Sequence, residues 1–265
     1  MDWPPFNKDI MNMQKEVRDP TFSAKFFDIP YYLSLHTEDI GYLTGKRVLD
    51  FGCNSGETAC GTALFHNPSL ILGGEFGEPW ARLGDTIAKS VGLNTLPPNL
   101  AFSSFEADYQ LPETEFHFVY SWGALASVPR AMLPTVVARI YERLRIGGRA
   151  LIQISPLYLS ARGSQLGEPS LGNWDHLLLN TAELRSQFFA KSDASEAAKT
   201  ARWRYFENLS RVTPAEILDV FLQAGFYNIR QREYFLDIEP PEDLQKKFAV
   251  EDLKRNQVIF LFGKA

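Results

Sequence analysis

The stretch Val48-Leu-Asp-Phe-Gly-Cys-Asn-Ser-Gly56 is the most informative part of the sequence, because it leads a short apolar run through a glycine turn into a helical segment. Residues 47–51 have the length and apolar content of a buried strand, and residues 56–65 are predicted to form a helix. The two glycines let the backbone approach a ligand closely, and Asn54 tolerates left-handed backbone angles better than most residues. The N–H groups that begin the helix are free to bind a ligand. By itself such a turn is also compatible with a purely structural role.

The next predicted strand, Leu70–Gly74, ends at an acidic residue. Glu75 follows Asp50 by 25 residues, close to the spacing of about 20 at which a carboxylate binds ribose hydroxyls in nucleotide-binding units. A dinucleotide turn would carry GxGxxG for its pyrophosphate, which is missing here. Asp50 would repel a pyrophosphate, whereas it suits a ligand with an amino group and a positive charge. The two carboxylates therefore indicate a cationic nucleoside ligand.

Outward from this unit, strands and helices continue to alternate. The apolar spacing predicts helices along Trp80–Val91 and Met132–Leu144, the second stopping at Gly147-Gly148, and a capped helix from Thr213 to Gly225. Further strands are predicted over residues 100–105, 116–121, 150–154, 226–235 and 257–262, the last two forming an antiparallel edge. Because helices between strands imply parallel neighbours with right-handed crossovers, we expect a doubly wound α/β sheet of seven strands.

The expected organisation has four parts. Residues 157–210 hold no strand candidate, so we interpret them as a helical insertion or lid after the fifth strand. The parts are a helical cap (1–44), a ligand-binding core (45–156), the insertion (157–210) and the completion of the core sheet (211–265).

Composition limits the classes of partner. The 265 residues are 45% hydrophobic and carry a formal net charge of −5, so there is no excess of Lys and Arg to neutralise a nucleic acid. No apolar run approaches the length of a membrane span or a secretory signal, which predicts a soluble, cytoplasmic protein with no membrane partner. The only cysteines, Cys53 and Cys60, are expected to be reduced thiols, and no metal-ligand spacing is present. These features favour a small or neutral substrate.

The run Lys46–Gly56 resembles the first motif of class I S-adenosylmethionine-dependent methyltransferases, V-L-D-x-G-C-G-x-G. Further pieces follow in the order of that family, with the late ones similar to the domain called type 11. They are Ala107–Pro112 (A-D-x-x-x-L-P), Phe116–Trp122 (F-D-x-V-x-S-x), Leu144–Arg149 (L-K-P-G-G-R), Val212–Glu216 and Ala224–Phe226. The sequence departs from the pattern at Asn54, His117 and Ile146, where the family has Gly, Asp and Pro. The resemblance implies a Rossmann-like, mainly parallel sheet with an antiparallel last strand.

The resemblance also implies S-adenosylmethionine as cofactor. In that family the second-strand acid, here Glu75, binds the ribose, and the acid matched by Asp108 contacts the adenine amino group. The implied cofactor-binding residues are Asp50, Gly52, Cys53, Asn54, Ser55, Gly56, Glu75, Phe76, Asp108, Tyr109, Ser121 and Trp122.

A softer resemblance lies in the insertion. Residues 158–176 are similar to the G-S-H…P-W-x-H stretch of some type 11 methyltransferases that act on sugars or glycans, although Gln165 replaces a histidine and Asn173 a proline. His176 is then the candidate base for an acceptor hydroxyl, with Asp175 orienting it or acting itself. The alternative is that His176 only tethers a lid helix.

Three functions follow from this sequence. The first is transfer of a methyl group to a hydroxyl of a small molecule or glycan. The second is methylation of a nitrogen or carbon atom, for which His176 would matter little. The third is a catalytically silent fold that serves as a binding or scaffold protein. The sequence indicates neither the substrate nor the oligomeric state.

Overall fold

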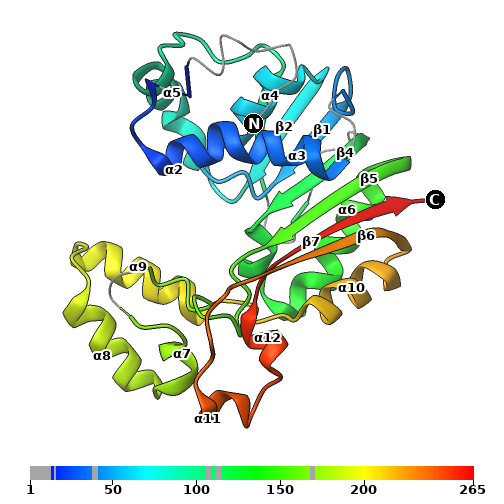
Figure 1. Cartoon of the computed structure of the whole chain (residues 1–265). Helices are drawn as coiled ribbons and strands as arrows, with labels where there is room; N and C mark the ends of the chain where they lie inside the picture. The colour runs from blue at the N-terminus through cyan, green and yellow to red at the C-terminus, as the bar shows by residue number, and fades with distance from the viewer. Residues whose placement is uncertain (1–12, 15, 38–40, 106–108, 111–114, 168–170) are drawn as a thin grey trace.

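The seven strands of the described residues form one sheet in the order β3-β2-β1-β4-β5-β7-β6 (Figure 1). This computed structural model describes residues 13–14, 16–37, 41–105, 109–110, 115–167 and 171–265. The first five strands are parallel, and β7 is antiparallel to both of its neighbours. The strands are β1 (Arg47–Phe51), β2 (Leu70–Glu75), β3 (Leu100–Ser104), β4 (Phe116–Trp122), β5 (Leu144–Ile154), β6 (Phe226–Phe235) and β7 (Arg255–Lys264). The predicted doubly wound, mainly parallel sheet is confirmed.

Helices cover both faces of the sheet because side chains along each strand alternate between the faces. Val48 of β1 packs in a buried cluster with Leu33 of α3 and Ala59 of α4, whereas the next residue, Leu49, belongs to the cluster of the opposite face, formed with α6 and α10. The helices of the core and cap are α2 (Pro20–Ser23), the π-helix η1 (Ala24–Asp28), α3 (Ile29–Thr37), α4 (Glu57–His66), α5 (Leu83–Val91), α6 (Leu133–Arg143) and α10 (Pro214–Gln223). Short 3-10 helices are η2 (Pro79–Arg82), η3 (Ala124–Ser127) and η4 (Arg130–Met132).

The predicted start of α10 has the expected capping geometry. The Thr213 hydroxyl accepts a hydrogen bond from the Glu216 N–H at 3.3 Å, and the Glu216 carboxylate accepts one from the Thr213 N–H at 2.8 Å. Pro214 takes the first helical position, where a missing N–H costs nothing. This reciprocal cap fixes where the chain re-enters the core.

Several predicted boundaries were wrong. The helix ending at Gly147-Gly148 stops instead at Arg143, and β5 begins at Leu144, which pairs with Phe116 before the ladder resumes at Arg149. The glycine pair lies in a bulge of β5, where Gly147 has φ of +72°. Trp80 belongs to η2, β3 ends one residue early at Ser104, and β7 starts two residues early at Arg255.

The segment between β5 and α10 forms a helical subassembly apart from the N-terminal helices (Figure 1). It contains α7 (Asp175–Leu178), α8 (Thr181–Lys191) and α9 (Glu196–Glu207), and α11 (Glu242–Gln245) and α12 (Val250–Lys254) lie between β6 and β7. Phe188 and Trp203 are buried at its centre. Among the described helices, none is both long and apolar enough to cross a membrane.

Candidate cofactor and acceptor site

A cavity of about 580 Å³ lies at the carboxyl ends of four adjacent strands. Glu75 of β2, Asp50 of β1, Trp122 of β4 and Ser155 just after β5 all line it. The carboxyl ends of parallel strands meet at one edge of a sheet, and ligands of doubly wound folds bind there. The predicted glycine turn lines this cavity with Gly52, Cys53 and Asn54.

The turn between β1 and α4 requires its glycines. Gly52 has φ of +81°, and a Cβ there would lie 2.1 Å from the Cβ of Ala124. Gly56 has φ of +87°, and a Cβ there would lie 2.7 Å from the Phe102 ring. Asn54 adopts φ of 49°, a left-handed conformation open to asparagine. A larger residue at position 52 would displace Ala124, which lines the cavity, and one at position 56 would displace the Phe102 ring.

Glu75 is held in place by backbone N–H groups. Its Oε2 accepts a hydrogen bond from the Asn54 N–H at 3.1 Å, and its Oε1 accepts one from the Phe76 N–H at 2.8 Å. A carboxylate has about four acceptor positions, so each oxygen can still accept a hydroxyl proton from a ligand. This arrangement fits a vicinal diol such as a ribose.

Asp50 is a buried carboxyl group on the cavity wall, with 2% exposure. One oxygen takes a hydrogen bond from the Tyr120 hydroxyl, and Oδ2 has no partner within the described residues. The pKa of Asp50 is raised to about 8, chiefly by burial; the hydrogen bond from Tyr120 opposes the rise and the charge of Glu75 adds to it. A cation placed in the cavity would satisfy this group.

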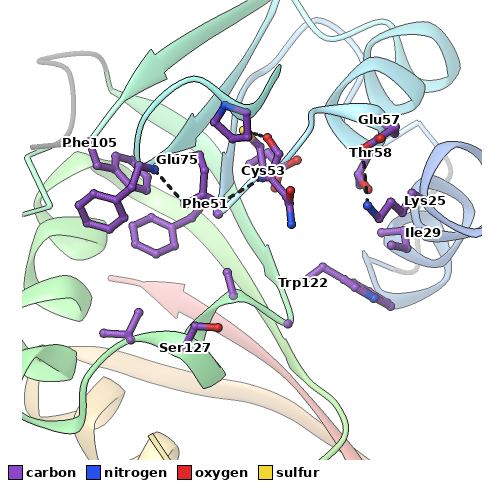
Figure 2. Close-up of a pocket in the computed structure, with 18 of the residues that line it drawn as sticks. Lys25, Ile29, Phe51, Cys53, Glu57, Thr58, Glu75, Phe105, Trp122 and Ser127 are labelled. Carbon is purple, nitrogen blue, oxygen red and sulfur yellow. Dashed lines mark hydrogen bonds and ion pairs between the residues drawn. The ribbon is translucent and has the colours of Figure 1, made fainter. Parts of the chain in front are cut away.

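The two ends of the cavity differ in chemistry. Figure 2 shows Phe51 and Phe105 on one side of Glu75, and Lys25 and Glu57 on the other. The rings of Phe51 and Phe105 are 4.9 Å apart, and Phe76 and Tyr109 complete this aromatic end, with ring centroids 4.7 Å apart. Aromatic faces and edges of this kind suit a planar heterocycle.

The remaining lining residues come from the end of β4 onward and include two side chains of the insertion. The Ser127 hydroxyl donates to the Tyr205 hydroxyl at 2.9 Å, and Tyr205 donates to Oε1 of Gln165 at 3.1 Å. The described residues lining this part are uncharged: Trp122, Gly123, Ala124, Ser127, Val128, Ser155, Gln165 and Tyr205. The arrangement offers hydrogen bonds to a neutral polar group.

Most of the residues predicted to bind a cofactor line this cavity. They are Asp50, Gly52, Cys53, Asn54, Glu75, Phe76, Tyr109 and Trp122. Ser55 and Gly56 shape the turn without lining the cavity, and Ser121 is fully buried, one strand position before Trp122. Asp108 lies outside the described residues.

The two residues predicted to be catalytic do not line the cavity. His176 is buried, and its Nε2 lies 2.6 Å from the carbonyl oxygen of Tyr158, whose ring packs edge-on against the imidazole. Burial lowers the pKa of His176. Asp175 accepts a hydrogen bond from the Gly172 N–H at 2.6 Å. This geometry favours the alternative stated above, in which His176 only tethers a helix of the insertion, here to Tyr158 of the same segment.

Sequence reasoning missed the charged pair and the polar cluster of the insertion. Lys25 and Glu57 are far apart in the chain, so no local motif joins them. Gln165 appeared only as the replacement of a family histidine, and nothing in the sequence around Tyr205 marked it as part of a site. Helical spacing gave no signal for Gln165 or Tyr205, because each of them contacts a partner from a distant element.

Solved structures of methyltransferases share this fold. One is a methyltransferase from Mesorhizobium loti that depends on S-adenosylmethionine; it is 17% identical with a TM-score of 0.52, covering 88% of this chain and 97% of its own. A SAM-dependent methyltransferase from Methanosarcina mazei has 17% identity and a TM-score of 0.51, covering 87% of this chain and 96% of its own. Phosphoethanolamine N-methyltransferase 2 of Haemonchus contortus, solved with S-adenosylmethionine, has 14% identity and a TM-score of 0.53, covering 90% of this chain and 52% of its own.

No protein-family model matches the chain, and no curated protein matches it in sequence. The resemblance to the type 11 domain therefore stays a prediction. The chain has the fold of class I S-adenosylmethionine-dependent methyltransferases.

Proposed function

We propose that this protein is an S-adenosylmethionine-dependent methyltransferase that acts on a hydroxyl group of a small molecule or glycan. The observation that carries the proposal is that one cavity is lined by aromatic rings, by Glu75 and by the unsatisfied carboxyl of Asp50. These three kinds of group are complementary to the adenine, the ribose and the positively charged amino-acid end of this cofactor. The structural neighbours support the same cofactor.

The residues present fit the cofactor. Phe51, Phe76, Phe105 and Tyr109 would enclose the adenine, and Glu75 would accept the ribose hydroxyls. The orphaned Oδ2 of Asp50 would take up positive charge from the amino-acid end. When bound, S-adenosylmethionine supplies an electrophilic methyl group on a sulfonium. The chain contributes by holding the acceptor in line with that group, since displacement depends on proximity and orientation.

A neutral acceptor is supported by the uncharged part of the cavity. Ser127, Gln165 and Tyr205 offer hydrogen bonds there, and no described side chain in that part carries a charge. A cationic acceptor would leave its charge without an acidic partner. A neutral amine or carbon acceptor is the competing assignment. The prediction that His176 and Asp175 remove the acceptor proton has no support from their position, and a His176→Ala variant with wild-type turnover would end it.

The cofactor assignment is tested by titrating S-adenosylhomocysteine into the purified protein by calorimetry. We expect Asp50→Asn and Glu75→Gln each to weaken binding about 10-fold or more, because each removes a charged partner worth about 1.5–3 kcal/mol. NAD+ serves as the control ligand and is expected not to bind, because the turn lacks the glycines of a dinucleotide site.

The outcomes separate the three functions. No binding of S-adenosylhomocysteine to the wild-type protein would refute the enzyme assignment and favour the scaffold. If it binds, a panel of alcohols, sugars and amines is supplied with S-adenosylmethionine carrying a labelled methyl group. Transfer to amines alone would refute the hydroxyl assignment.

A further inference from the structure

The cavity contains one basic side chain among the described residues that line it, Lys25. It comes from the N-terminal cap, on the π-helix η1, and lies at the end of the cavity opposite the aromatic rings (Figure 2). Its Nζ is 3.7 Å from Oε2 of Glu57, in the first turn of α4. Three carboxyl groups, Asp50, Glu57 and Glu75, line the same cavity. An anionic group of a ligand therefore has a single favourable position.

The backbone around Lys25 is fixed against α4. A Cβ on Gly61 would lie 2.0 Å from the carbonyl oxygen of Phe26, so the cap and α4 are in backbone contact at this glycine. His66, at the end of α4, has its Nε2 2.8 Å from the carbonyl oxygen of Pro30. Phe26 is fully buried beside Lys25. Together with the pair to Glu57, these contacts align the cap along the whole of α4.

The charge pattern matches an α-amino acid. A zwitterionic end carries one anion and one cation a few ångströms apart, and the pair of Lys25 and Glu57 presents the opposite charges at 3.7 Å. Thr58 lines the cavity next to Glu57, at the N-terminus of α4, where free N–H groups and the helix dipole add to the attraction for a carboxylate. In the proposed function, the aromatic end and Glu75 already bind the nucleoside part of the ligand.

We propose that Lys25 binds the α-carboxylate of the cofactor's amino-acid end, exchanging part of its pairing with Glu57 for that carboxylate. This inference rests on the proposed function and extends it to the cap. It makes the N-terminal cap a wall of the cofactor site, and it makes Lys25 the residue that selects ligands with an amino-acid carboxylate over shorter nucleosides.

The test compares two ligands that differ only in the carboxylate. S-adenosylhomocysteine and its decarboxylated analogue, S-adenosyl-3-thiopropylamine, are titrated by calorimetry into the wild type, Lys25→Met and Lys25→Arg. The wild type is expected to prefer S-adenosylhomocysteine by about 10- to 100-fold, the range of a charge-assisted hydrogen bond. Lys25→Met should lose that preference because its affinity for S-adenosylhomocysteine alone falls. Lys25→Arg should keep most of the preference.

A matched variant, Lys89→Met at an exposed position of α5, controls for the loss of a lysine. Unchanged preference in Lys25→Met would overturn the assignment, as would an equal loss of affinity for both ligands, which would mean that Lys25 acts only through the packing of the cap. Failure of the wild type to bind either ligand would instead refute the proposed function. Thermal unfolding of each variant identifies any that does not fold.

Discussion

Among single residues, Asp50 determines how the stability of the ligand-free protein responds to pH. It is buried on the cavity wall with one oxygen bonded to Tyr120 and the other without a partner within the described chain. Burial raises its pKa from 3.8 to about 8, so the folded protein holds a proton that the unfolded chain releases above about pH 4. Between these values the folded state binds more protons than the unfolded state.

This difference predicts the sign of a stability change. Because the unfolded state binds fewer protons, the contribution of Asp50 to the free energy of unfolding falls as pH rises from about 4 to about 8, by up to about 1.4 kcal/mol per pH unit. Asp50→Asn removes the titration while keeping an oxygen for the Tyr120 hydroxyl. Denaturant unfolding of the ligand-free protein at pH 5, 6 and 7 should therefore give a shallower decline for Asp50→Asn than for the wild type.

Asp219→Asn, at an exposed position of α10, is the control and should leave the wild-type slope unchanged. Parallel curves for Asp50→Asn and the wild type would mean that Asp50 is ionised in the folded protein. In that case the attraction for a cationic ligand would already be present before binding, and affinity would not depend on pH in this range.

At the scale of elements, the packing of η1 on α4 depends on Gly61. A Cβ at this position would approach the Phe26 carbonyl oxygen to 2.0 Å, a backbone contact that side-chain rotation does not relieve. Gly61→Ala should lower the free energy of unfolding by about 1–3 kcal/mol, as overpacking does, despite the higher helix propensity of alanine. The substitution should also lower the affinity for S-adenosylhomocysteine, because Lys25 moves with the cap.

Gly84→Ala in α5 is the matched control for this substitution. A Cβ on Gly84 meets nothing within 4 Å, so the change should stabilise the protein by about 1 kcal/mol through helix propensity and leave ligand affinity unchanged. Equal effects of the two variants in chemical denaturation and calorimetry would show that the cap tolerates displacement from α4.

The elements were predictable where local pattern determines them. The apolar run before Gly52 and the cap at Thr213 specify their own structure through burial and capping, and both are confirmed. The pair Gly147-Gly148 gave a wrong helix end in the prediction, because glycines suit a helix end and a strand bulge equally well. Only the pairing of Leu144 with Phe116, a contact between distant segments, shows that the strand has already begun.

The residues of the site likewise divide into those that local pattern predicts and those that depend on contacts between distant segments. Asp50 and Glu75 follow directly from the ends of two neighbouring parallel strands, so the sequence places them together. Lys25 and Tyr205 enter the cavity from the cap and the insertion, and their positions depend on how those parts pack on the sheet. His176 is a different case: a motif suggested a catalytic role, which stays a prediction, whereas the structure shows its ring hydrogen-bonded to the carbonyl oxygen of Tyr158.

At the scale of the whole molecule, the insertion is joined to the core beside the cavity. Tyr205 of α9 bonds to Ser127 of η3 and to Gln165, and both the N–H and the hydroxyl of Ser210 donate to the Ala126 carbonyl oxygen. Ala124 in the same 3-10 helix faces Gly52 of the turn between β1 and α4. The helix η3 therefore contacts both the turn and the insertion.

Tyr205→Phe removes two hydrogen bonds of this junction while keeping the ring. Each bond contributes about 0.5–1.5 kcal/mol, so opening of the insertion should become easier by about 1–3 kcal/mol. Hydrogen exchange measured by mass spectrometry should show faster exchange in peptides of α9 and unchanged exchange in β1 and β4. Tyr234→Phe on the exposed edge strand β6 is the control; unchanged exchange of α9 in Tyr205→Phe would mean that its other contacts hold the insertion closed.

The strand β7 pairs with both β5 and β6, so the sheet cannot be completed until β7 has been translated. On the ribosome the chain emerges from its N-terminus, so β6 is complete about twenty residues before β7, its sheet partner, exists. Until then β5 and β6 both present unpaired backbone groups, which are prone to associate with other chains. Translation of the last strand is thus the step that closes the sheet, and a nascent chain paused before Arg255 would be the form most in need of a chaperone.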